Sequence, residues 1–536
     1  MSAAAKVELA SVGTRSASLS LGTATIRAIV IALCASYVAI FARLAGFSLQ
    51  DFPNHLARAV AMSDLLFHDG VRFADLFQYH FAVVPYLLGD LFLTGAVDVF
   101  GIREATALWI ALVMLSLPLA LLFYLRGTRI AASAQVVILV LSLYLSTDGF
   151  LFMGFLTFRL AVALTIVGIG LVQRLRAEWS AARYAFFCGV VVIGYLIHLS
   201  TLLFLAVAIA STAALRVWRG CASSRQEAYL LIPLGVLALF QLAFAQHVHP
   251  STDLPAEAFD WGSWYWKGQH LQWEYLRYYG THIDSRVDRL LLLAFVLCLA
   301  WPVARLRSFA AFRKPEVLEL LLLAAVFCLM YVVLPSSFGD ASYIDLRPLA
   351  VVPIFLMLAS AYLVRENSTS PRFGVWVVPA LAILLAIGNL VYLTTHLAND
   401  NAWMARYRTI VAAIPKRAKV LPMYPGTAQL KPFMHAASFA VIDREAFIPY
   451  MFSGNRGNPQ TYFRYTHLPY APPASWYYMP QPLASKVDWG AIACTYDFLL
   501  VMKPFDLGRI GVPTTPIVEN ASASLLAVTK HRCITS

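Results

Sequence analysis

Long apolar segments recur along most of this chain of 536 residues, and they constrain its fold more than any other feature. A helix needs roughly 20 consecutive, mainly apolar residues to cross a lipid bilayer. Segments that meet this criterion lie at 26–45, 104–125, 130–147, 155–173, 184–198, 200–216, 229–246, 288–304, 317–334, 348–364 and 374–395. Because 60% of the residues are hydrophobic and only 13% are charged, the chain has too little polar surface to cover such helices in water. We therefore predict a mainly α fold, a polytopic transmembrane helical bundle of about eleven spans.

The basic residues are concentrated in alternate connectors between these segments. They are Arg126 and Arg129; Arg174, Arg176 and Arg183; Arg216, Arg219 and Arg225; Arg305 through Lys314; and Arg365 with Arg372. By the positive-inside rule, the side of the membrane that carries these connectors is cytoplasmic. Residues 1–25 then form a disordered cytoplasmic tail, and the first apolar segment is an uncleaved span rather than a signal peptide. The connectors also account for most of the net charge of +12, so a nucleic-acid partner is not expected.

The first outer loop, residues 46–103, is predicted to hold two juxtamembrane helices. Its second half, 83–100, is apolar enough to be scored as a span, but it contains Asp90 and Asp98. A charge near mid-bilayer costs about 2.5–3.5 kcal/mol, and a crossing here would also place the later basic connectors outside. We therefore predict a helix that lies at the outer surface. A second such helix is predicted at 55–68, where apolar residues recur at helical spacing.

The character of the sequence changes after residue 397, at the end of the predicted transmembrane module 26–397. Residues 398–536 alternate short apolar stretches with turns rich in Pro, Gly and Asn, which is typical of a small α/β domain. Strands are expected at 419–423, 438–442, 498–502 and 525–529, and a helix at 402–414. The predicted topology places this C-terminal domain on the extracytoplasmic side.

The most informative polar cluster is residues 51–58, directly after the first span. In one interpretation Asp51 caps the helix that follows, and Asn54, His55 and Arg58 form its solvated face. In the other interpretation Asp51 is a carboxylate held at the membrane surface as a general base. Asn54, His55 and Arg58 are then candidates for contacting the acceptor. The local sequence does not decide between these two interpretations.

At this point the arrangement resembles the GT-C glycosyltransferase superfamily, which includes the protein O-mannosyltransferases, the oligosaccharyltransferases and the aminoarabinose transferases of lipid A. The resemblance is carried by Asp51 at the start of the first outer loop, the two juxtamembrane helices, the many spans and the outer C-terminal domain. It implies an inverting sugar transfer from a polyprenyl-phosphate-linked donor to a glycan, lipid or protein acceptor, with Asp51 taking the acceptor's proton. It also implies a bacterial inner membrane location with a periplasmic C-terminal domain. Many members have an acidic pair at this position, whereas Phe52 follows Asp51 here, so neither a metal nor another cofactor is expected.

An inverting transfer also needs a cation that stabilises the departing lipid phosphate, and the planar guanidinium of Arg suits this role. The outer-side candidates are Arg347 at the start of a span, Lys267, Arg277 and Arg286 in the aromatic outer loop 247–287, and His198 between two closely spaced spans. Each has a structural alternative. Arg347 could be an interfacial anchor, His198 could satisfy a turn, and the aromatic loop could form an interfacial belt.

Two further outer positions are candidates for the acceptor side. Asp148 lies in a turn between spans, where an Asp-Gly turn is an equally good explanation. Arg159 lies inside a predicted span near its outer end, and a charge within the membrane is a functional hypothesis by default. We expect either Asp148 or Asp51 to be its partner.

Cys494 and Cys533 are the two cysteines of the predicted C-terminal domain. Because that domain is expected in an oxidising compartment, the two are predicted to form a disulfide; the alternative is two free thiols.

Two other functions fit the same composition. A transporter or flippase of lipid-linked glycans would carry polar residues through many spans, or broken helices at matching places in two halves of the chain. A non-catalytic membrane scaffold would keep the fold without the transfer reaction.

Overall fold

The computed structural model describes residues 28–43, 48–128, 130–248, 259–271, 285–304, 309–338, 341–364, 374–425, 428–454, 461–472 and 487–530. The predicted N-terminal tail 1–25 lies outside these residues, as does much of the loop 247–287.

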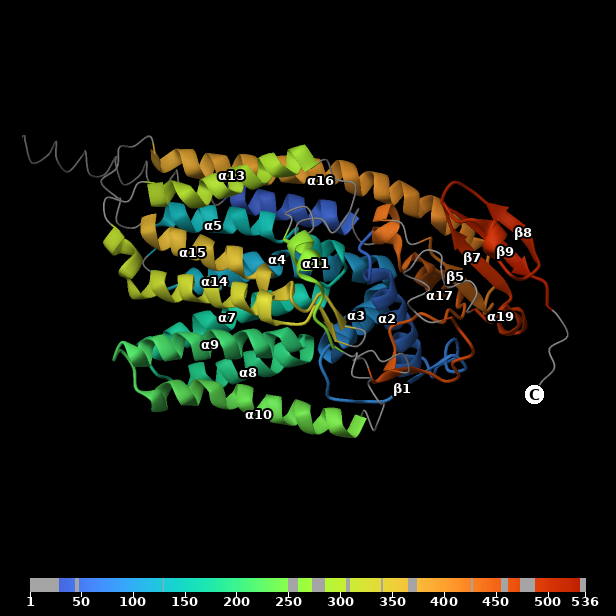
Figure 1. The fold of residues 1–536 in the computed structure, drawn as a ribbon, viewed down its shortest axis with the longest axis horizontal. Helices are drawn as coiled ribbons and strands as arrows, with labels where there is room; N and C mark the ends of the chain where they lie inside the picture. Colours follow the sequence, from blue (N-terminus) through green and yellow to red (C-terminus); the bar gives the residue numbers. More distant parts are fainter. Residues whose placement is uncertain are drawn as a thin grey trace, which may run out of the picture.

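The described part of the chain is dominated by helices that run side by side in one bundle (Figure 1). Eight of them are long and apolar enough to cross a bilayer, and three shorter apolar helices bring the set into agreement with the eleven predicted spans. In chain order they are the helix Ala28–Arg43, α4 (Ile102–Leu125), α5 (Ala132–Leu145) with the short α6 (Gly149–Phe152), α7 (Leu156–Ala177), α8 (Ala181–Ile197), α9 (Leu199–Trp218), α10 (Ser224–Val248), α13 (Ser285–Ala304), α14 (Pro315–Val333), η3 (Arg347–Ala350) with α15 (Val352–Val364), and α16 (Gly374–Ala412). The predicted mainly α, polytopic fold is confirmed.

Two helices lie across one end of the bundle, as predicted for the first outer loop (Figure 1). They are α2 (Phe52–Phe67) and α3 (Leu87–Phe100), which pack against each other. Among the described residues, α3 belongs neither to the eight helices that could cross a bilayer nor to the three shorter apolar ones. This agrees with the prediction that residues 83–100 do not cross.

A four-stranded sheet lies at the far end of the molecule, beyond α2 and α3 (Figure 1). Its order is β5-β7-β9-β8, and only the β5–β7 pair is parallel. The strands are β5 (Val420–Met423), β7 (Phe498–Met502), β8 (Thr514–Glu519) and β9 (Ala523–Val528). Three of the four predicted strands are therefore confirmed in place.

Two elements of this region differ from prediction. Residues 438–442 belong to η6 (Ala436–Ser438) and the helix α17 (Phe439–Arg444), not to a strand. A short, fully buried apolar run has no periodicity that separates strand from helix, which explains the error. The predicted helix 402–414 is the end of α16, which is continuous over 39 residues. The predicted domain boundary at 397/398 therefore falls inside a helix.

The C-terminal part of the chain is interleaved with the first outer loop. The short strand β1 (Phe77–Tyr79) pairs antiparallel with β6 (Phe463–Tyr465), and α2 packs against η6 and α17. Residues far apart in sequence therefore enclose α2, which positions the site described below.

The remaining described elements are short. They are β2 (Phe259–Asp260), β3 (Ser337–Phe338) and β4 (Ala341–Ser342), which form a small sheet, α11 (Trp264–His270), α19 (Trp489–Thr495), and the 3-10 helices η2 (Phe309–Arg313), η5 (Ala428–Phe433) and η9 (Leu507–Arg509).

Candidate functional site

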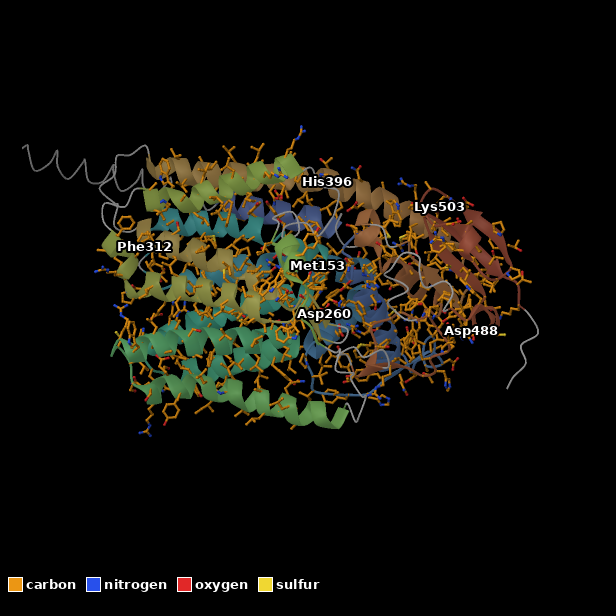
Figure 2. All side chains as sticks on the ribbon, in the orientation of Figure 1. Met153, Asp260, Phe312, His396, Asp488 and Lys503 are labelled. Carbon is orange, nitrogen blue, oxygen red and sulfur yellow. The ribbon has the colours of Figure 1, made fainter. Side chains whose placement is uncertain are left out.

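The backbone of Asp51 is fixed by the turn that follows α6. The Asp51 N–H donates to the carbonyl of Met153 (3.1 Å), and the Gln50 N–H donates to the carbonyl of Phe152 (3.0 Å). Gly154 has a φ of +79°, and a Cβ at this position would lie 2.6 Å from the Asp51 nitrogen. Only glycine allows such a close approach. Figure 2 shows Met153 in the middle of the molecule, where the bundle meets the outer segments.

The Asp51 carboxylate is not used as a helix cap, although Asp51 occupies the N-cap position of α2. Its Oδ1 atom lies 3.3 Å from Nε2 of Gln50 and 3.5 Å from Nε2 of His435. Oδ2 accepts no hydrogen bond from the described residues, and the side chain of Asp51 is 13% exposed to solvent. The capping interpretation therefore does not account for this side chain.

The pKa of the Asp51 carboxyl is raised to about 7. The main cause is burial, which penalises the ionised form, while the Gln50 amide and the charge of Arg347 act in the opposite direction. A carboxyl group that titrates near neutral pH can take up a proton during a reaction, which is what a general base requires.

Arg347 lies against Phe155, the residue after Gly154, and its charge acts on the Asp51 carboxyl. Its guanidinium lies over the rings of Phe155 (5.4 Å) and Phe158 (5.8 Å), and Nη2 donates to the carbonyl of Ser342 (3.2 Å). Its Nε is buried without a hydrogen-bond partner, and no carboxylate of the described residues lies within 4.0 Å of the guanidinium. The Arg347 guanidinium is therefore a cation that forms no ion pair with the described residues.

Asn54 points into the protein and holds the C-terminal segment against α2. Its Nδ2 donates to the carbonyl of Tyr450 (2.9 Å), and its Oδ1 accepts from the N–H of Phe452 (2.8 Å). The prediction that Asn54, His55 and Arg58 form a solvated face is wrong, because α2 is covered by this segment on the side that faces away from the bundle. Asn54 and Arg58 are fully buried.

Arg58 and Asp90 form a buried ion pair that joins α2 to α3. Nη2 of Arg58 lies 2.7 Å from Oδ2 of Asp90 and 2.7 Å from Nδ1 of His55, and the Tyr462 hydroxyl also donates to Asp90. Burial and the charge of Arg58 lower the pKa of His55 to about 3, so this imidazole is neutral and accepts from Arg58. His55 and Arg58 therefore hold the two juxtamembrane helices together.

Arg159 and Asp148 form the pair that was expected for a charge inside a span. Nη1 of Arg159 lies 2.6 Å from Oδ2 of Asp148, and Nη2 donates to the carbonyl of Leu145 (3.0 Å). Asp148 also caps α6 by accepting from the N–H of Leu151 (3.1 Å). The pair thus anchors the turn whose carbonyls position Asp51.

Lys267 is buried at the end of α14 and bound to protein groups. Its ammonium group donates to the carbonyls of Tyr331, Val332 and Leu334 (2.8–3.2 Å) and lies 3.6 Å from Asp345. These contacts cap the helix, a structural role that leaves little capacity for a donor phosphate.

Three other residues were predicted as phosphate ligands. Arg286 is exposed in the first turn of α13, and Arg277 lies outside the described residues. His198 caps α9, because its Nδ1 accepts from the N–H of Ser200 (3.0 Å), and its Nε2 lies 3.2 Å from the Tyr86 hydroxyl. The turn interpretation of His198 thus accounts for both ring nitrogens, although His198 is also within range of the charge of Arg347.

Cys494 in α19 is disulfide-bonded. The other five cysteines of the described residues are free. Cys533 lies outside the described residues, so its pairing with Cys494 remains a prediction.

Three residues at the site were not identified from the sequence: Gln50, Gly154 and His435. His435 stands alone in an apolar stretch, and Gly154 lies between apolar residues, so neither position carried a signal of its role. Among the described residues, no group of three or more His, Cys, Asp or Glu side chains is arranged to hold a metal ion.

No protein-family model and no curated protein matches this chain. The solved structures that are similar to it in fold include two of ArnT from Cupriavidus metallidurans. The apo crystal structure is 11% identical with a TM-score of 0.48, and the structure bound to undecaprenyl phosphate is 12% identical with a TM-score of 0.49. Each comparison covers 93% of this chain and 97% of the other.

Proposed function

We propose that this protein is a membrane glycosyltransferase of the GT-C type. It transfers a sugar from a polyprenyl-phosphate-linked donor to a hydroxyl of a glycan, lipid or protein acceptor, with inversion, at the outer face of a bacterial inner membrane. The observation that carries this proposal is the buried Asp51 carboxyl, whose pKa of about 7 suits a general base. Among the described residues, its Oδ2 accepts no hydrogen bond, and the nearby guanidinium of Arg347 forms no ion pair.

The proposed reaction is a single displacement at the anomeric carbon. Oδ2 of Asp51 takes the proton of the acceptor hydroxyl as its oxygen forms a bond to the anomeric carbon. The bond between that carbon and the phosphate oxygen breaks, and its electron pair leaves with the polyprenyl phosphate. The Arg347 guanidinium stabilises the negative charge that develops on the phosphate. Attack from the face opposite the leaving group inverts the anomeric centre.

The position of the site suits a lipid-linked donor. Trp261, Trp264 and Tyr265 are exposed on the segment that holds α11, which lies beside the middle of the molecule in Figure 1. Exposed Trp and Tyr are typical of the headgroup layer of a membrane. A lipid phosphate in that layer would lie at the level of Asp51 and Arg347. With this end of the bundle outside, the N-terminus is cytoplasmic and the C-terminal sheet periplasmic.

A reconstituted assay tests the proposed function. The purified protein in lipid nanodiscs is mixed with polyprenyl-phosphate-linked hexose or pentose and a cell-envelope extract as acceptor, and release of polyprenyl phosphate is measured. We expect release that depends on both the protein and the extract. Movement of intact donor across a proteoliposome bilayer without release would instead identify a flippase. The absence of both activities in folded protein, over a panel of donors, would favour the scaffold.

A further inference from the structure

Among the described residues, two polar groups contact the Asp51 carboxylate, and both lie against the same oxygen, Oδ1. They come from Nε2 of Gln50 at 3.3 Å and Nε2 of His435 at 3.5 Å. Gln50 is the neighbouring residue, but His435 comes from the C-terminal part of the chain. The contacts leave Oδ2 as the oxygen that can meet a substrate.

The imidazole of His435 is held firmly in this position. Its side chain is 4% exposed and packs edge-on against Phe452, with ring centroids 4.9 Å apart. Its backbone carbonyl accepts from the N–H of Ser438 (3.0 Å). Burial lowers the pKa of His435 to about 3, so the ring is neutral, and one of its nitrogens carries a hydrogen.

The segment that carries His435 is attached to α2 by side chains directly after Asp51. Asn54 binds the backbone of Tyr450 and Phe452 through both of its amide atoms, and Nη1 of Arg58 donates to the carbonyl of Phe452 (3.2 Å). Nε2 of Gln50 also lies 3.9 Å from the sulfur of Met434. The surroundings of Asp51 are therefore complete only when residues 434–452 are seated on α2.

We propose that His435 is a positioning residue for Asp51. Its Nε2–H holds Oδ1 and thereby directs Oδ2 toward the acceptor, so that the general base is assembled by the docking of the C-terminal segment. Only the predicted effect of His435 on the rate of sugar transfer rests on the proposed function. The effect on the carboxyl itself does not require that any transfer takes place.

The test compares His435→Phe with His435→Gln in the purified full-length chain. Phe keeps the ring that packs on Phe452 but removes the N–H, whereas the Gln amide can place an N–H near the position of Nε2. His68→Phe serves as a matched control, since His68 is a partly exposed histidine at the other end of α2. Thermal unfolding is measured for all variants, so that loss of folding is recognised.

An activity-independent readout follows the Asp51 carboxyl directly. A water-soluble carbodiimide labels a carboxyl in its protonated form, and the pH midpoint of labelling at Asp51 is measured by mass spectrometry. Because the N–H favours the ionised carboxylate, we expect His435→Phe to move the midpoint upward by about one pH unit. His435→Gln should restore most of the shift, and His68→Phe should show none. An unchanged midpoint in well-folded His435→Phe would overturn the proposal.

In the transfer assay, His435→Phe should lower kcat by about 10–100-fold with little change in KM, and the acid limb of the pH profile should move with the labelling midpoint. If the wild type shows no transfer, the proposed function fails, while the labelling experiment still decides the role of His435. If Phe and Gln variants lose kcat equally and neither midpoint moves, His435 is a packing residue only.

Discussion

Nη1 of Arg159 lies 2.6 Å from Oδ2 of Asp148, which links the start of α7 to the cap of α6. The carbonyls of Phe152 and Met153, at the end of that short helix, accept the backbone N–H groups of Gln50 and Asp51. Arg159, which lies inside a predicted span, thus helps to fix the turn that positions the backbone of Asp51.

We expect Arg159→Met to destabilise the protein by about 3–5 kcal/mol, because it removes the buried guanidinium that pairs with the partly buried Asp148 carboxylate. The double variant Arg159→Met with Asp148→Asn should recover much of this loss, since Asn still caps α6 but carries no charge. Thermal unfolding in detergent measures both. An Arg159→Met variant that unfolds at the wild-type temperature would show that the ion pair does not matter.

The buried Arg58–Asp90 ion pair leads to a second prediction about stability. Arg58 is fully buried, so Asp90→Asn should cost about 3–5 kcal/mol and loosen α3 from α2. Hydrogen exchange of the α3 amides should rise in this variant. As a control, Asp98→Asn removes a carboxylate of α3 that pairs with the partly exposed His68, and it should cost less than about 1 kcal/mol. Similar effects of the two substitutions would contradict the assignment.

Much of the fold could be predicted from the sequence because the bilayer sets the length of every span. Asp90 and Asp98, together with the basic connectors that follow, led to the prediction that residues 83–100 do not cross. The error at 402–414 has a physical cause. The polar residues 399–401 are typical of a helix end, but α16 continues beyond the bundle, where polar side chains are compatible with a helix.

The site could be predicted only in part. Asp51 was identified because its position is local to the first outer loop. The burial of Arg58 could not be predicted, since an Arg on an amphipathic helix is normally solvated and its partner Asp90 belongs to another helix. The same holds for His435, whose contact with Asp51 exists only in the tertiary structure.

Substitution of Arg347 tests whether this residue binds the phosphate of the lipid-linked donor. We expect Arg347→Lys to raise the KM for the lipid-linked donor by about tenfold or more, because a point charge cannot reproduce bidentate recognition of phosphate. Arg225→Lys is a suitable control, as Arg225 is exposed in the first turn of α10 and lies in a predicted cytoplasmic connector. If Arg347→Lys behaves like the wild type and Arg347→Ala lowers only the membrane yield, Arg347 is an interfacial anchor.

The next prediction concerns the disulfide bond of the C-terminal region. We expect the disulfide of Cys494 to be formed with Cys533. A bridge of this kind would close a loop of about 40 residues and stabilise the fold by roughly 3–4 kcal/mol in the chain-entropy model. Peptide mapping without reductant should find the two cysteines in one linked peptide. Free alkylation of both thiols in untreated protein would refute the pairing.

Asp51 carries the central claim, and its pKa fixes the sign of the pH dependence. A general base acts in its ionised form, and the pKa of Asp51 is about 7. The transfer rate should therefore rise with pH up to about 7 and fall about tenfold for each pH unit below it. Asp51→Asn removes the proton acceptor but keeps the size of the side chain.

The most direct test is the rate of sugar transfer by Asp51→Asn, measured beside the wild type over pH 5–9 in the same lipid nanodiscs. The account predicts a loss of about 10²–10⁴-fold near neutral pH, with little change in thermal stability. An Asp51→Asn variant that transfers sugar at the wild-type rate would contradict the assignment of Asp51 as the base.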